Sequence, residues 1–380
     1  MEPCRDSLKR IQDVEGLSTV KFITIKYNSN RMKKLFLSLI ATMVATISFA
    51  QSQTATVLRG DEIKTYFGLS SLVSAMTEAM DGDIITLSQG QFKASKITKA
   101  VTLRGAGMVE STDALVYYLP TVIDGDFTLQ LDENTNGKLT IEGIKFTGSV
   151  NFDGVLLNPT FINCNFNIFR YKYTTSKIQD ANFIHCRVGN NLTIYDNSTV
   201  TCINSIVRRP SSYQYSENST FEFVNCVLTH VIPHYQTGVY SGSGTNWYLT
   251  YSSFKNCYIY VDTNYEYYMP FNSNTLVTNC VSNYSAMFTN IANNTNKIIA
   301  PSVVFDSYTG GTWNDGQKFY LRDEAKTSYL GDDGTQIGIY GGNIPYEERI
   351  SMPKITKCNV AGRTTVDGKL SVDIQVEAAQ

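Results

Sequence analysis

Hydrophobic and polar positions alternate in a six-residue phrase that occurs seven times between residues 141 and 282. Its third residue is Asn in five copies, Gly in one and His in one. Alternation with a period of two predicts a β-strand, and a third residue that tolerates a turn conformation predicts a bend after it. The phrases begin at Ile141, Phe161, Phe183, Cys202, Phe223, Phe254 and Val277.

The spacing between phrases predicts the architecture. Successive third positions are 20, 22, 19, 21, 31 and 23 residues apart. This period belongs to solenoids, and it leaves too few residues for a pair of helices. We therefore expect one coil per phrase. Coils stacked in register at roughly 4.8 Å would align the Asn side chains amide to amide and place the Cys side chains in a column inside.

The Asn-Cys pairs at Asn163, Asn225, Asn256 and Asn279 resemble the repeat of the right-handed parallel β-helix, the pectate-lyase-like superfamily. The resemblance runs from Gly82 to Gly342 and implies three strands per coil with an Asn ladder at one turn. Residues 331–342 resemble the closing segment of secreted β-helix proteins from Bacteroidetes-type bacteria. Because a fold does not determine a chemistry, the resemblance implies the architecture and leaves the activity open.

We therefore predict an all-β chain whose main part, residues 84–342, is a single-stranded right-handed parallel β-helix. Residues 51–83 are expected to form a leading strand and a short helix beginning near Ser70, which caps the first coil. Residues 343–380 are expected to form a C-terminal β extension that covers the other end, with strands at Ile355–Val360 and Leu370–Val376. The predicted inner face of the helix comprises Leu72, Val73, Met76, Ala79 and Met80.

The first fifty residues predict export. Met32-Lys-Lys precedes an apolar run from Leu35 to Ala45, and Ser48-Phe49-Ala50 follows. This order is typical of a signal peptide, here residues 32–50, cleaved near Ala50. Residues 1–31 lie upstream of the expected start at Met32. No other segment approaches eighteen consecutive apolar residues, so no membrane span is predicted. The expected location is the periplasm, the cell surface or the medium.

Charge argues against a nucleic-acid partner. Residues 1–50 hold eight Lys or Arg and four Asp or Glu, so the rest of the chain keeps 24 basic and 30 acidic residues, a formal charge of −6. A mildly acidic body without a basic run does not suit nucleic acid. We expect a monomer whose partner, if it has one, is a polysaccharide or a component of the cell surface.

The cysteines are predicted to be free and buried. Stacked side chains on parallel strands point the same way, which is poor disulfide geometry, and a buried thiol packs as a small hydrophobic group. The sequence has no Cys-x-x-Cys pair for zinc, no grouped carboxylates for calcium and no paired Asp residues for glycoside hydrolysis. We predict no metal site and no cofactor.

Alternation also predicts which residues face outward before each phrase. If Val150, Phe152, Phe169, Tyr171, Tyr173, Leu192 and Ile194 point inward, neighbouring coils bring together Asp153, Arg170, Lys172 and Tyr195. These four could hold an acidic sugar, or catalyse β-elimination with Arg170 or Lys172 as base and Tyr195 as acid. The alternative is a cross-strand ion pair on a solvated sheet.

The longest interval, between Asn225 and Asn256, predicts a loop. Insertions in solenoids emerge on one face and often bind, and aromatic rings suit sugar stacking. The predicted contacts in this loop are His234, Tyr235, Tyr240, Trp247 and Tyr248. A plain surface loop is the alternative, and a metal held by His230 and His234 is a rarer one.

Three functional hypotheses follow from these patterns. The first is an exported, non-catalytic β-helix that binds glycan or a surface partner along its long face. The second is a polysaccharide lyase or another carbohydrate-active enzyme that acts on an acidic glycan. The third is a structural surface protein without a ligand.

Overall fold

The computed structural model describes residues 53–110, 119–131, 137–212, 219–231, 234–235, 249, 251–262, 268–269, 271, 274–291, 295–314, 317–347, 354–360 and 372–377. All of them belong to one compact unit, Gln53–Gln380. The predicted signal peptide, residues 32–50, and the stretch before it lie outside the described residues. No helix within the described ranges is long and apolar enough to cross a membrane.

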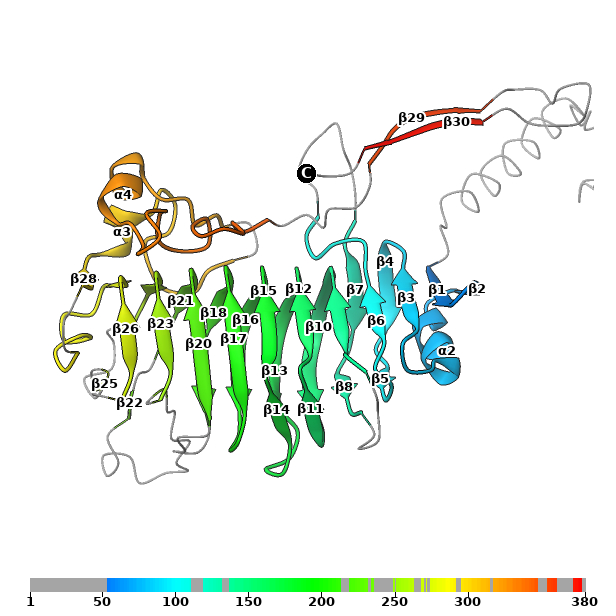
Figure 1. Cartoon of the computed structure of the whole chain (residues 1–380), viewed down its shortest axis with the longest axis horizontal. Helices are drawn as coiled ribbons and strands as arrows, with labels where there is room; N and C mark the ends of the chain where they lie inside the picture. Colours follow the sequence, from blue (N-terminus) through cyan, green and yellow to red (C-terminus); the bar gives the residue numbers. More distant parts are fainter. Residues whose placement is uncertain are drawn as a thin grey trace, which may run out of the picture. The chain divides into compact units, whose positions relative to one another are not determined.

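Strands from successive coils lie side by side and form a parallel β-solenoid (Figure 1). One of its two large sheets, which we call sheet A, is parallel from β3 onward. The order in sheet A is β2 (Glu62–Phe67), β1 (Thr54–Arg59), β3 (Ile84–Leu87), β6 (Thr102–Arg104), β9 (Thr140–Glu142), β12 (Thr160–Ile162), β15 (Ala181–Ile184), β17 (Thr199–Ile203), β20 (Thr220–Val224), β23 (Ser253–Lys255) and β26 (Leu276–Thr278).

The register of sheet A confirms the winding predicted from the phrases. Phe161 pairs with Ile141 on one side and with Phe183 on the other. Cys202 continues the same row, and the row ends at Val277. Every phrase therefore begins at the same height in its coil, and residues that share a position in the phrase form a column.

Most strands of the second large sheet, sheet B, directly follow the turn at the third phrase position. Its main path comprises β4 (Gly90–Lys93), β7 (Thr121–Asp124), β10 (Ile144–Phe152), β13 (Asn165–Tyr171), β16 (Arg187–Ile194), β18 (Ile206–Arg208), β21 (Val227–Thr229), β24 (Tyr258–Ile259), β27 (Val281–Ser282) and β28 (Lys297–Ile298). Three further strands join it at its sides: β5 (Lys96–Ile97), β8 (Phe127–Leu129) and β19 (Pro210–Ser212).

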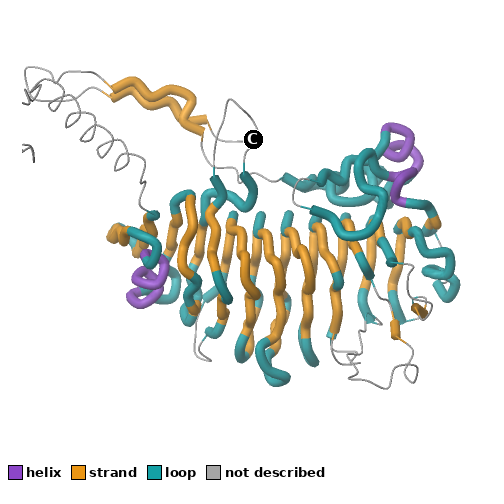
Figure 2. The backbone as a smooth tube through the Cα atoms, turned by 180° about the vertical axis from the view of Figure 1, so that it is seen from behind, coloured by secondary structure: helices purple, strands orange, loops and turns teal. Residues whose placement is uncertain are grey.

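The long strands of sheet B bend in the middle (Figure 2). The register shifts between Phe146 and Ser149 in β10 and between Phe166 and Ile168 in β13, as at a β-bulge. A Cβ atom at Gly148 would lie 2.3 Å from the carbonyl oxygen of Gly125, so only glycine fits at the first bend. The residues after the bend form a separate face of the coil.

The remaining strands form three two-stranded sheets. β11 (Val155–Leu157) and β14 (Lys177–Gln179) are parallel and extend the corner before sheet A. β22 (His234–Tyr235) pairs antiparallel with β25 (Tyr268–Met269). β29 (Lys354–Val360) and β30 (Val372–Glu377) form the antiparallel pair expected near the C-terminus. Their predicted role in covering a solenoid end stays a prediction.

The third position of each phrase is the bend that the sequence predicts. Its φ lies between 45° and 55° at the six non-glycine copies and is 68° at Gly143. The backbone N–H of Asn163 donates to Ile184 O in the next coil at 3.0 Å, and every other copy except Asn279 makes the equivalent bond. The column is confirmed, and Asn, which tolerates left-handed backbone better than most residues, suits it.

The Asn side chains differ from the expected amide-to-amide ladder. Asn204 Nδ2 donates to Ile339 O at 2.8 Å and to Gly341 O at 2.7 Å. The imidazole of His185, also expected to bond within the ladder, has Nε2 2.8 Å from Ile344 O. These side chains therefore bind a later segment of the chain, which their spacing alone could not reveal.

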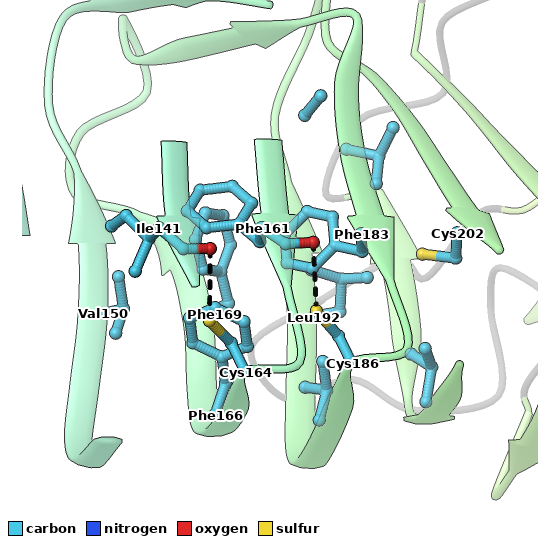
Figure 3. Packing of buried hydrophobic residues seen from close by; sticks show 14 of the residues in the cluster. Ile141, Val150, Phe161, Cys164, Phe166, Phe169, Phe183, Cys186, Leu192 and Cys202 are labelled. Atoms are coloured by element: carbon cyan, nitrogen blue, oxygen red, sulfur yellow. Dashed lines mark hydrogen bonds between the residues drawn. The ribbon is translucent and has the colours of Figure 1, made fainter. Parts of the chain in front are cut away.

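The six cysteines that the structure describes between residues 164 and 280 are free and buried, as predicted. Five of the six thiols donate to a backbone carbonyl, among them Cys164 Sγ to Ile141 O at 3.5 Å and Cys186 Sγ to Phe161 O at 3.3 Å (Figure 3). The N–H of Cys226 donates to Cys257 Sγ at 3.4 Å. The column therefore links coils by hydrogen bonds as well as by packing.

A short helix, α2 (Ser71–Glu78), lies at the N-terminal end of the solenoid, near the predicted position. Leu72, Met76 and Ala79 are buried, as expected of a cap over the first coil. Met80 was predicted on the same face, but it is 55% exposed because the helix ends two residues before it. Asp83 is buried beside Arg59, whose hydrogen bonds hold the pKa of this carboxyl below its usual range.

Residues 300–347, which we call the cover, fold back against the outside of sheet B. The cover includes α3 (Pro301–Val304) and α4 (Asp323–Ser328). The sequence prediction continued the coils to Gly342, whereas the last strand of sheet B is β28 and the cover follows it. The cover and sheet B share a second hydrophobic cluster, which contains Ile206, Val227, Tyr258 and Val281 from the fifth phrase position and Val304, Phe305, Tyr308, Trp313, Phe319, Leu321, Ile337, Ile339 and Tyr346 from the cover.

Candidate functional site

The outward residues after the bend of sheet B form the predicted strip on three neighbouring coils. Val150, Phe152, Phe169, Leu192 and Ile194 are fully buried, which confirms the alternation on β10, β13 and β16. The side chains between them point to the opposite face. We call this face the strip, and its members are Asn151, Asp153, Arg170, Lys172, Thr193 and Tyr195.

Two polar contacts cross the strip from coil to coil. Asn151 pairs with Arg170 in register, and Arg170 Nε donates to Asn151 Oδ1 at 3.1 Å. One step along, Lys172 Nζ lies 3.1 Å from Asp153 Oδ2. The structure therefore brings together Asp153, Arg170 and Lys172 as the sequence predicted, and it pairs the carboxylate with Lys172.

The ion pair sets the protonation of Lys172. Its hydrogen bond to Asp153 raises the pKa of the Lys172 ammonium above its ordinary value. A lysine acts as a base only when it loses its proton, and an ammonium held by a carboxylate keeps it. Lys172 therefore suits the binding of an anionic or hydroxyl group better than proton abstraction at neutral pH.

Aromatic rings lie near the Lys172 end of the strip, and Tyr171 is partly buried against the core, as predicted for an inward residue. The rings of Tyr171 and Tyr195 have centroids 5.1 Å apart, and Lys172 Nζ lies 5.0 Å from the ring centroid of Tyr173. Tyr173 was predicted to point inward, but it is 55% exposed. The reason is that β13 ends at Tyr171, so the alternation does not extend into the turn that follows.

The predicted loop contacts are only partly placed. The backbones of His234 and Tyr235 form β22, where they pair with Met269 and Tyr268. Tyr240, Trp247 and Tyr248 lie outside the described residues. The structure therefore leaves the proposed sugar contacts of this loop as predictions.

A second polar cluster lies on sheet B, where the chain turns after β18 and β21. Arg208 of β18 pairs in register with Thr229 of β21. The next residues, Arg209 and His230, have φ of 47° and 57°. His230 Nδ1 lies 3.6 Å from Asp262 Oδ2. The sequence analysis overlooked Arg208 and Arg209, although two adjacent arginines directly after a phrase are unusual in a chain with few charges.

His230 is held in its neutral form. Burial, followed by the positive charges of Arg209 and Arg208, lowers its pKa to about 4, although Asp262 acts in the opposite direction. Below its ordinary pKa of about 6.5, the unfolded chain binds a proton that the folded chain excludes. Stability should therefore fall as the pH drops from about 6.5 to about 4, by roughly 2 to 3 kcal/mol for this group.

We expect His230→Asn to remove this part of the pH dependence, because Asn tolerates the left-handed backbone of residue 230 and does not titrate. The measurement is the free energy of unfolding in guanidinium chloride at pH 7.0, 5.5 and 4.5 for both proteins. Equal pH slopes for the wild type and the variant would contradict the assignment.

The described residues contain no group of three or more His, Cys, Asp or Glu arranged to hold a metal ion. Comparisons of the chain with protein-family models, with curated proteins and with solved structures found no match. A function can therefore be inferred only from the geometry of the strip and of the arginine cluster.

Proposed function

We propose that this chain is an exported protein that binds glycan along the strip without cleaving it. The observation that carries the proposal is the arrangement of Asn151, Asp153, Arg170 and Lys172 on one face, with the rings of Tyr173 and Tyr195 near its end. Charged and amide groups supply hydrogen bonds to sugar hydroxyl and carboxylate groups, and aromatic rings supply flat apolar contact.

The position of the strip supports this proposal. β13 lies between two parallel neighbours, β10 and β16, so its backbone is fixed on both sides. Side chains on such a scaffold are held in place before a ligand arrives, which reduces the entropy cost of binding. A repeat of about 4.8 Å between coils also offers an extended ligand equivalent contacts in succession.

The lyase alternative has less support. It requires Arg170 or Lys172 to accept a proton, but Lys172 carries a raised pKa through its bond to Asp153. An arginine guanidinium keeps its proton over the accessible pH range. A binding function uses both residues in their charged forms, and the bond to Asp153 favours that form of Lys172.

The test is a glycan array with the wild-type chain, followed by calorimetry on the best ligand. We expect Arg170→Ala and Tyr195→Ala each to weaken binding by about tenfold or more, which corresponds to about 1.4 kcal/mol. Arg170→Ala removes a donor and a charge, and Tyr195→Ala removes a stacking surface.

The matched control is Arg104→Gln, which removes one positive charge from sheet A, where Arg104 Nε lies 3.3 Å from Glu142 Oε2. It should leave glycan affinity unchanged. An array without a hit, or equal losses in the control and the strip variants, would refute the proposal. An unsaturated product detected by ultraviolet absorbance would favour the lyase instead.

A further inference from the structure

The arginine cluster contains hydrogen-bond donors without acceptors. Arg208 Nε, Arg209 Nε and Thr229 Oγ1 are buried, and each has no hydrogen-bond partner. Thr229 as a whole is buried, and both arginines are half-buried. A buried donor left without an acceptor costs about 1–3 kcal/mol, and more when it is charged. Three such atoms in neighbouring residues of two coils would together be costly to stability, so their lack of acceptors requires an explanation.

Register and a backbone hydrogen bond bring the three residues together. Arg208 and Thr229 are direct neighbours on β18 and β21, and the N–H of Arg209 donates to Thr229 O at 3.2 Å. Burial, followed by the positive charge of Arg209, lowers the pKa of the Arg208 guanidinium. The two cations are thus close enough to repel each other.

Neither arginine has an acidic partner of its own among the residues that the structure describes. Arg59 and Asp83, at the end of the solenoid near α2, show how this chain pairs a guanidinium with a carboxylate. There Arg59 Nε and Nη2 donate to the two oxygens of Asp83 at 2.9 and 2.7 Å. This chain therefore does match a guanidinium with a carboxylate where the role is structural. At Arg208 and Arg209 the described residues supply no such bidentate carboxylate.

The surroundings suit a small anion. Asp262, the nearby carboxylate, faces His230 at 3.6 Å, and His230 is neutral at physiological pH because its pKa is lowered to about 4. The cluster therefore carries two positive charges against one negative charge. The charge of Arg208 acts on Tyr308 of the cover, whose ring lies 5.8 Å, centroid to centroid, from that of Tyr260.

We propose that Arg208, Arg209 and Thr229 form a binding site for a single oxyanion, a carboxylate, sulfate or phosphate group of a ligand. The anion would accept hydrogen bonds from both guanidinium groups and from the hydroxyl, and it would relieve the repulsion between the two cations. The site is separate from the strip, so this inference does not rest on the proposed glycan function.

The experiment is calorimetric titration of the full-length chain with sodium sulfate, sodium phosphate and sodium glucuronate, at constant ionic strength set with sodium chloride. We expect saturable binding of at least one of the three. Arg208→Gln and Arg209→Asn should each weaken it at least tenfold, and Asn is chosen at residue 209 because it tolerates the left-handed backbone. Arg104→Gln should bind as the wild type does.

Melting temperature separates binding from a structural role. In chloride buffer alone, Arg208→Gln should melt at the wild-type temperature or above it, because a buried charge without a partner has been removed. The added anion should raise the melting temperature of the wild type and leave that of the variant unchanged. A large drop for Arg208→Gln in chloride would instead indicate a structural guanidinium and overturn the proposal.

The three probes distinguish the source of the anion. Binding of glucuronate above sulfate and phosphate would identify a sugar carboxylate, and the reverse order would identify a sulfate or phosphate group. Absence of saturable binding by all three, or wild-type affinity in both arginine variants, would refute the site. Loss of glycan binding in Arg170→Ala with intact sulfate binding would separate this site from the strip.

Discussion

Phe183→Ala should destabilise the chain by about 3–5 kcal/mol, the usual cost of removing a large buried side chain and leaving a cavity. The Phe183 ring lies 4.7 Å from that of Phe161, 5.0 Å from that of Phe169 and 5.7 Å from that of Phe166, measured between centroids. These rings come from both sheets and from two coils (Figure 3). The cavity therefore removes contacts between neighbouring coils.

Phe183→Leu is the matched control for this substitution. It keeps most of the volume and should cost less than about 1.5 kcal/mol. Guanidinium chloride unfolding followed by circular dichroism measures both, with hydrogen exchange of β15 as the local readout. If the Ala and Leu variants have the same midpoint, the aromatic cluster does not hold the coils together.

Gly342→Ala should release the cover from the Asn column, at a cost of about 4 kcal/mol. A Cβ atom at Gly342 would lie 2.1 Å from Asn225 Nδ2, and the φ of this residue is +76°. The left-handed backbone alone costs an alanine about 1–2 kcal/mol, and overpacking adds about 1–3 kcal/mol. Hydrogen exchange and limited proteolysis of residues 331–346 should both accelerate.

Gly334→Ala separates the two costs of that substitution. Gly334 has the same φ of +76°, but a Cβ atom there meets nothing within 4 Å. It should therefore show the backbone cost of about 1–2 kcal/mol and no faster proteolysis of the cover. Equal losses in the two variants would mean that the close approach to Asn225 contributes nothing.

The coils were predictable because they depend on local repetition. The turn at Asn163, the row from Ile141 to Val277 and the buried thiols all follow from alternation and period. The strip followed from the same parity rule on β10, β13 and β16. The rule failed at Tyr173, where the strand had already ended and the side chain no longer had a sheet to alternate across.

The cover could not be predicted from the phrase because its contacts join residues far apart in the chain, up to 159 positions for Arg187 and Tyr346. Arg187 is buried, and its Nε donates to the Tyr346 hydroxyl at 2.6 Å. A signal was nevertheless present in the sequence. The fifth phrase position is apolar in four successive coils, at Ile206, Val227, Tyr258 and Val281, although it points away from the core of the solenoid. Apolar residues on an outer face indicate that another segment covers them.

The arginine cluster shows a different limit of sequence analysis. Arg208 and Arg209 are adjacent in the chain, but their lack of partners depends on what the neighbouring coils place around them. Thr229 and His230 come from the next coil, and Asp262 from the one after it. An orphaned buried donor can be recognised only once the surrounding atoms are placed.

The route of the cover fixes how many coils lie beneath it. Asp332 contacts Asn256, Ile339 and Gly341 contact Asn204, and Ile344 contacts His185. The cover is therefore bound to several coils, in the order opposite to that in which the coils follow one another in the chain. Duplication or deletion of a coil between His185 and Asn256 would shift these anchors by about 4.8 Å and break them. Changes in repeat number should therefore be tolerated least between His185 and Asn256.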